Sequence, residues 1–160
     1  MLLKAIAFKL FHNGKVRMNG KDSLGKITSF EVLTLRLSGM RSTQEYEFVC
    51  QGDETLLYDY MIMYGRGEEK DRRQEEGRAV LKTAEVIEKF NEWKLGGWNG
   101  FDGPNPPGVL DGTMFMLTGK VNDGKTLRAE GSNNFPEYYH DMTRYIYDRL
   151  REAEDETKPH

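Results

Sequence analysis

Stretches rich in aliphatic and aromatic residues recur along the first half of the chain. In residues 29–37, SFEVLTLRL, the side chains of Leu33, Leu35 and Leu37 share one side, and the other side is also mostly apolar. This pattern predicts a central strand. Residues 45–50, EYEFVC, and residues 55–65, TLLYDYMIMYG, are rich in aromatic and aliphatic residues and are predicted to pair as a hairpin.

Two segments around these strands are harder to assign. Residues 3–11 fit helical spacing, but HNGK at 12–15 is a hairpin signal, so residues 2–11 are either strand or helix and strand is preferred. Residues 65–78 mix charges of both signs without an apolar period, and they are predicted to form a solvated loop.

The second half of the chain predicts two amphipathic helices. The first lies within residues 80–95, and its apolar stripe consists of Ala84, Ile87 and Phe90, widened by Val86 and Trp93. Gly96 and Gly97 then predict a left-handed C-cap. The second helix follows NNFPEYYHD, with Pro136 expected in its first turn and a stripe of Tyr139, Met142, Ile146, Leu150 and Ala153.

Between these helices, TMFMLTGKV and KTLRAEG flank an NDG turn and predict a second hairpin. No alternation of strand and helix forces a parallel sheet. We therefore expect an α+β fold, with a single antiparallel sheet and two main helices packed on one face. The 160-residue length predicts one domain over residues 1–155, followed by a polar tail at 156–160.

Composition and charge exclude several classes of function. The formal net charge is -3 and the basic residues are scattered, which argues against nucleic-acid binding. Cys50 is the single cysteine, so neither an internal disulfide nor a structural zinc site is expected, and a cytoplasmic location is favoured. No apolar run approaches the roughly 20 residues that cross a bilayer, so no membrane association is predicted.

Motifs that carry chemistry are mostly absent. The chain has no phosphate-binding loop, nucleophile elbow or zinc-protease motif, so neither a cofactor nor a metal site is expected, and catalytic residues stay unknown. Asp102, Asp111 and His140 are the candidates for an acid, a base or cation ligands in a hydrolase. A turn role explains the two aspartates equally well, because each precedes a glycine.

Residues 96–112, GGWNGFDGPNPPGVLDG, are the most unusual segment, with six glycines and three prolines. They form either a packed plug between two elements or part of a site, and the exposure of the aromatic residues decides between them. The candidate binding surface consists of Trp98, Phe101, Asp102, Asp111, Tyr138 and His140.

Four segments in the second half, WNGFDG, VLDGTMFML, DGK and EGSNNFPEYYHDMTRYI, together resemble a family of small, uncharacterised bacterial proteins. The shared pattern is a W-x-x-F turn, an Asp-Gly before an apolar strand, an Asp-Gly hairpin and a G-[ST]-N-x-[FY]-P step into a terminal helix. It spans about residues 80–150. The resemblance implies the same α+β order and no activity, substrate or catalytic residue.

These observations lead to three hypotheses about function. The first is a non-enzymatic binding or protein-interaction domain whose partner is an unknown protein or small ligand. The second is a hydrolase that uses Asp102, Asp111 and His140. The third is a structural domain that self-associates through a sheet edge, which would make it a possible homodimer.

Overall fold

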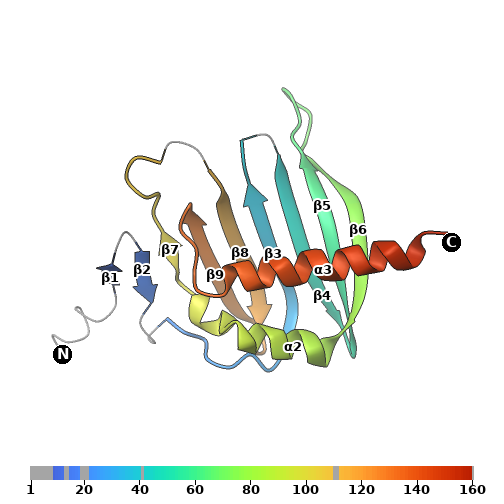
Figure 1. Cartoon of the computed structure of the whole chain (residues 1–160), viewed down its shortest axis with the longest axis horizontal. Coiled ribbons are helices and arrows are strands. Elements are labelled where there is room, and N and C mark those ends of the chain that lie inside the picture. The colour runs from blue at the N-terminus through green and yellow to red at the C-terminus, as the bar shows by residue number, and fades with distance from the viewer. Residues whose placement is uncertain (1–8, 13–14, 19–21, 41, 110–111, 160) are drawn as a thin grey trace.

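The computed structural model describes residues 9–12, 15–18, 22–40, 42–109 and 112–159. Within them, the first strands are followed by a helix, further strands and a closing helix, which confirms the α+β class (Figure 1). No helix in these ranges combines the length and the apolar composition needed to cross a membrane.

The main sheet of the described chain has seven strands in the order β6-β5-β4-β3-β8-β9-β7. Its first four strands in sequence form a meander: β3 Phe30–Ser38, β4 Thr43–Gln51, β5 Glu54–Met63 and β6 Arg72–Lys82. The others are β7 Asp102–Gly103, β8 Met114–Val121 and β9 Lys125–Ser132. A separate antiparallel pair, β1 Lys9–His12 and β2 Lys15–Met18, lies beside β7 (Figure 1).

The sheet is mixed, so the prediction of an antiparallel sheet is wrong at one edge. The short strand β7 runs parallel to Glu130 and Gly131 of β9, whereas every other described pairing in the sheet is antiparallel. Just before β7, the Phe101 carbonyl accepts a hydrogen bond of 3.0 Å from the Glu130 N–H. A strand of two residues carries no alternating pattern, and its Asp-Gly pair resembles a turn, so the sequence offers no signal for it.

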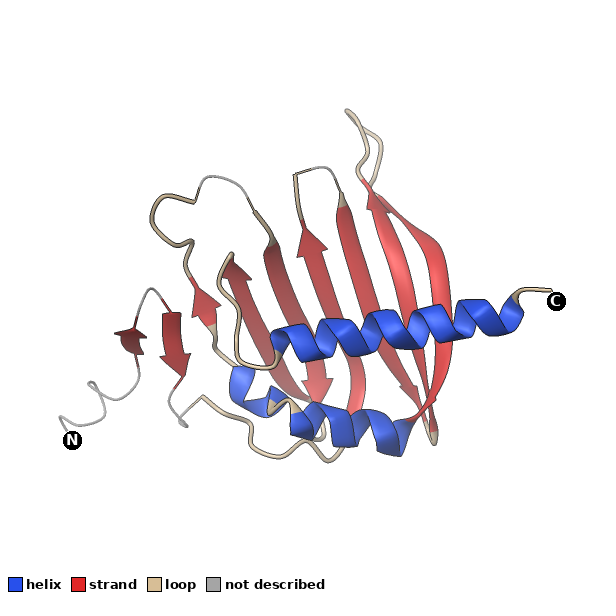
Figure 2. Cartoon of the chain, viewed as in Figure 1, coloured by secondary structure: helices blue, strands red, loops and turns tan. Residues whose placement is uncertain are grey.

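The helical elements are α2 Thr83–Glu92, the 3-10 helix η1 Leu95–Trp98 and α3 Tyr139–Thr157. Figures 1 and 2 show α2 and α3 lying across the same face of the sheet. The turn after α2 differs from the predicted glycine cap, because Lys94 takes the left-handed conformation and Gly96 lies inside η1. Gly96 has a packing role instead, since a Cβ atom there would collide with the carbonyl oxygen of Gly25.

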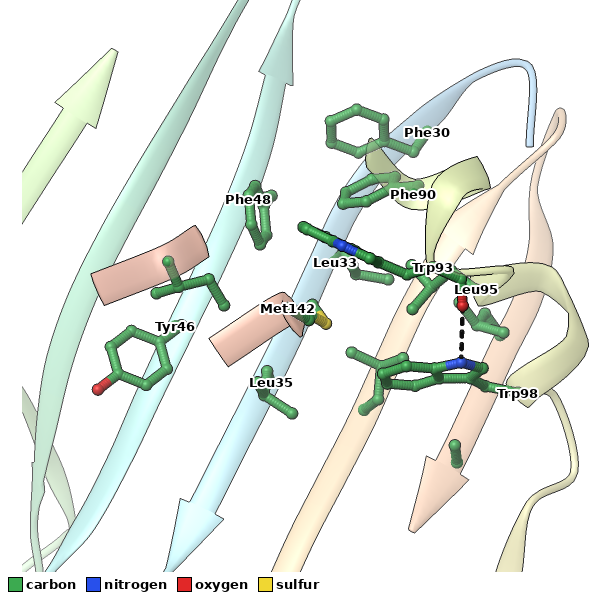
Figure 3. Packing of buried hydrophobic residues seen from close by; sticks show 14 of the residues in the cluster. Phe30, Leu33, Leu35, Tyr46, Phe48, Phe90, Trp93, Leu95, Trp98 and Met142 are labelled. Carbon is green, nitrogen blue, oxygen red and sulfur yellow. Dashed lines mark hydrogen bonds between the residues drawn. The ribbon is translucent and has the colours of Figure 1, made fainter. Parts of the chain in front are cut away.

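The hydrophobic core lies between the sheet and these helices (Figure 3). Phe90 of α2 is fully buried, and its ring meets the edges of Phe30 and Phe48 at centroid distances of 5.1 and 5.3 Å. Met142 of α3 is also fully buried near Leu35 of β3 (Figure 3). Aromatic rings in this arrangement contribute both buried area and favourable edge contacts, which hold α2 to the centre of the sheet.

The sheet residues that point away from α2 and α3 form a second face, which we call the open face. Of the described helices, none crosses it (Figure 2). Antiparallel register aligns its side chains into rows across the strands. One such row contains Glu75, Tyr60, Glu45, Arg36, Met116, Glu130 and Asp102.

The mixed-charge segment 65–78 is predicted to be a loop, and this is wrong for its second half, because β6 begins at Arg72. It is an edge strand whose register with β5 shifts at a bulge between Asp59 and Tyr60. Near the bulge, β6 carries polar residues on both of its faces, so the sequence shows no alternation of apolar and polar residues that would predict a strand. The pairing with β5 supplies the backbone hydrogen bonds instead.

The ends of the chain also refine the sequence-based prediction. Residues 9–12 form a strand, which is the alternative that the sequence favours over a helix, while residues 2–8 lie outside the described residues. Pro136 precedes α3 instead of lying in its first turn, and its carbonyl accepts a hydrogen bond of 3.2 Å from the Tyr139 N–H. The helix continues to Thr157, into the segment expected to be a polar tail.

Candidate functional site

Trp98 and Phe101, the two aromatic residues of the candidate binding surface in segment 96–112, lie in the core. Their exposed fractions are 4% and 5%. The Trp98 Nε1–H donates a hydrogen bond of 3.1 Å to the Trp93 carbonyl (Figure 3), and the Phe101 ring lies 6.0 Å from that of Phe115. Neither ring is available to a partner, and this part of the segment is a packed plug.

The other predicted site residues that the structure describes lie on β7 and at the start of α3. Asp102 is exposed on β7, and Asp111 lies outside the described residues. Tyr138 is half-buried at the start of α3, with the Lys94 Nζ 5.9 Å from the centre of its ring. His140 is exposed on the first turn of α3, next to the ring of Phe135.

These positions bear on the hydrolase hypothesis. Asp102 lines a groove on the open face, whereas His140 lines neither this groove nor the depression between α2 and α3. Across the described ranges, no group of three or more His, Cys, Asp or Glu side chains is arranged to hold a metal ion. Asp102 and His140 therefore do not meet at either of these depressions.

The open face carries a candidate site that sequence reasoning missed, apart from Asp102. A groove of about 330 Å³ crosses strands β3, β8, β9 and β7. Its floor includes Met114 and Met116, and its walls include Arg36 on one side and Asp102 and Glu130 on the other. The apolar floor and the charged walls together make a surface that can contact both parts of an amphipathic ligand.

An ionic network connects the groove to the rest of the open face. The Glu45 carboxylate is only 6% exposed, and it accepts hydrogen bonds of 2.9 and 2.8 Å from Arg36 and of 3.1 Å from Arg73. Arg73 also donates to Glu47 at 3.2 Å. Since both arginines are nearly half exposed, the network holds their guanidinium groups on the surface in fixed positions.

Two tyrosines extend this network toward β6. The rings of Tyr58 and Tyr60 stack at 5.4 Å with an angle of 21° between their planes. The guanidinium of Arg73 lies 4.2 Å from the centre of the Tyr60 ring, and that of Arg78 lies 5.4 Å from the Tyr58 ring. Partial burial raises the pKa of the Tyr60 hydroxyl, while the nearby Arg73 charge opposes that rise.

A second depression, of about 360 Å³, lies between α2 and α3. Trp93 and Tyr145 line it together with Tyr138, and charged residues of both signs surround them, including Lys89 and Asp141. The Tyr145 hydroxyl donates a hydrogen bond of 3.4 Å to Glu85, and burial raises the pKa of that hydroxyl. Its aromatic residues mainly join the two helices, because the edge of Trp93 packs against Tyr145 at 5.3 Å.

A partial signal for the open face exists in the sequence. Polar residues alternate with apolar ones in EVLTLRLS and TQEYEFVC, which places Arg36 and Glu45 on the side opposite the core. The register that brings these two side chains together is not encoded locally, since it depends on how β3 and β4 pair. Comparison of the chain with protein-family models, with curated proteins and with solved structures finds no match.

Proposed function

We propose that this protein is a non-enzymatic binding domain that holds a segment of a partner protein across its open face. The observation that carries the proposal is the set of side chains presented there: Arg36, Arg73, Arg78, Tyr58, Tyr60, Tyr64, Met114 and Met116. Arginine, tyrosine and methionine are the residue types enriched at protein interfaces. Tyrosine and arginine also carry a large share of binding energy when an interface buries them.

The size and surroundings of the groove favour a chain segment as the ligand. Its volume of about 330 Å³ accommodates one or two side chains and lies at the low end of small-molecule sites. Two strongly exposed apolar side chains line the groove, since Tyr64 is 61% and Met114 is 57% exposed. A partner segment that lies in the groove would cover both.

The alternative functions receive less support from the same geometry. Self-association through β6 is disfavoured because that edge strand carries a charged run and a bulge, two features that prevent edge pairing. Hydrolysis is disfavoured because Asp102 lines the open-face groove without His140. A single domain over residues 1–155 is part of the same proposal, since α2 and α3 share one core with the sheet.

Cys50 supports a cytoplasmic location as part of this proposal. It is the single cysteine of the chain, and its thiol is free and partly buried. Its sulfur lies 3.9 Å from the Thr83 hydroxyl oxygen. A free thiol of this kind is typical of proteins in a reducing compartment.

A displayed library of random dodecapeptides, selected against the full chain, tests the proposal. We expect enriched peptides whose binding weakens about tenfold in Met114→Ser/Met116→Ser, because this variant removes two apolar contacts from the groove floor. The matched control is Met40→Ser/Met63→Ser, which removes two exposed methionines outside the groove and should leave binding unchanged.

Nuclear magnetic resonance of the labelled protein locates the bound peptide independently. Shifts are expected for backbone amides of β3, β8 and β9 at the groove. Shifts confined to α2 and α3 would contradict the proposal, as would a library from which no peptide is enriched. An equal loss of binding in the two double variants would also contradict it.

A further inference from the structure

The two walls of the open-face groove differ in how their charges are balanced. On the β3 side, the positive charge of Arg36 is matched by the buried Glu45 carboxylate, to which Arg36 donates two hydrogen bonds. On the other side, Asp102 and Glu130 are register partners on the adjacent strands β7 and β9. Both carboxylates line the groove, so the charge left unbalanced inside it is negative.

The pairing of these two carboxylates is unfavourable for the fold. Like charges directly opposite each other on neighbouring strands destabilise a sheet. Among the described residues, the Asp102 side chain makes no hydrogen bond or ion pair, and the Glu130 carboxylate makes only a long ion pair, with its Oε2 3.7 Å from the Arg128 Nη2. Nothing in the described packing therefore requires two acidic residues at this wall.

The floor of the groove separates the two walls by a distance that a side chain can span. In the row across the sheet, Met116 of β8 lies between Arg36 and Glu130, so the two walls are two strand spacings, about 9 to 10 Å, apart. The floor is flexible and apolar there, because Met114 and Met116 both line the groove. A ligand that fits must combine an apolar stem with a positively charged end.

Resting on the proposed function, we propose that the groove binds a lysine or arginine side chain of the partner segment, with its aliphatic stem on Met116 and its charged end at Asp102 and Glu130. Basic side chains bind in this way because their methylene stems cover apolar surface while the charged head stays at a polar rim. The head group would form charge-assisted hydrogen bonds to the carboxylates. A bare calcium ion is a poorer fit, because it takes about six to eight oxygen ligands.

The test uses peptides enriched from the random library on the full chain, with selection carried out in the presence of a chelator. We expect these peptides to contain a lysine or arginine next to an apolar residue. Replacing that basic residue by glutamine, or using the variant Asp102→Asn/Glu130→Gln, should weaken binding about tenfold. High salt should reduce binding to the unmodified chain more than binding to the variant.

The matched control is Asp123→Asn/Glu31→Gln, which removes one aspartate and one glutamate at exposed positions outside the groove. It gives the same change in net charge and should keep full binding. Enriched peptides without basic residues, or equal binding to both double variants, would overturn the inference. If such peptides still lose binding in Met114→Ser/Met116→Ser, the proposed function stands without it, and if no peptide is enriched, both fail.

Discussion

A substitution of Glu45 tests the ionic network of the open face most directly. Its side chain is 6% exposed and accepts three hydrogen bonds from the guanidinium groups of Arg36 and Arg73. In Glu45→Gln, the amide keeps one acceptor oxygen but places a donor group against these donors. The substitution therefore removes the charge assistance and opposes part of the contact.

The magnitude follows from the burial of the three groups. Hydrogen bonds to charged groups contribute about 1.5 to 3 kcal/mol each when both partners are buried. Arg36 and Arg73 are 47% and 45% exposed, so solvent screening brings each contact closer to the surface value of about 1 kcal/mol or less. We expect Glu45→Gln to lower the free energy of unfolding by about 2 kcal/mol.

Urea denaturation at low and at high salt measures this effect. The urea concentration at the unfolding midpoint is compared between variant and unmodified protein, provided that the slope of the unfolding free energy against urea concentration is unchanged. The control is Glu47→Gln, because Glu47 is 19% exposed and, among the described residues, it makes a single ion pair, the 3.2 Å contact with Arg73. It should cost about 0.5 kcal/mol, and that cost should shrink in high salt, whereas the cost at Glu45 should persist. Equal costs at the two positions would refute the idea that Glu45 organises the network.

Substitutions at three further positions test other parts of the fold. Phe90→Ala should destabilise the protein by about 3 to 5 kcal/mol, measured by urea denaturation, because it leaves a cavity in the core. Asn133→Gly keeps the left-handed backbone but loses two side-chain hydrogen bonds, one accepted from the Thr113 N–H and one donated to Asn105. It should lower the free energy of unfolding by about 1 to 2 kcal/mol and speed amide exchange at Thr113. Asn133→Asp keeps an acceptor oxygen for this amide and should protect it from exchange. Burial raises the pKa of Asp59, so the stability associated with its proton is present at low pH and is lost as pH rises through the raised pKa. Asp59→Asn should therefore stabilise the protein by less than about 1 kcal/mol at pH 7 and have no effect near pH 3, and a stability gain equal at both pH values would contradict this.

The parts of the fold that sequence predicted well are those set by local chemistry. The NDG turn is one, since Asn122, Asp123 and Gly124 all take positive φ angles between β8 and β9. The helical stripe of α2 was predicted in part: Val86 and Phe90 are fully buried, but Ala84 is exposed. Helical spacing alone allows several stripes, and the position of the sheet selects among them.

The parts that sequence could not predict depend on pairing between distant segments. Strand β6 is rich in charge because it lies at an edge, where Arg73 and Arg78 cover the rings of two tyrosines on β5. A charged run gives no sign of these rings unless the register is known. The same holds for the groove, because Asp102 and Glu130 are adjacent in space through a parallel pairing of two residues.

In the proposed function, the face under the helices supplies most of the stability and the open face binds the partner. The face under α2 and α3 buries Leu33, Leu35 and Phe48 completely, and such burial supplies most of the favourable free energy of folding. The open face does not need apolar residues for this purpose, because one side of an antiparallel sheet can face water. Met114 lies on that side and is more than half exposed, so its side chain adds little to the free energy of folding. An apolar residue at this position can therefore be selected for contact with a partner without a cost in stability.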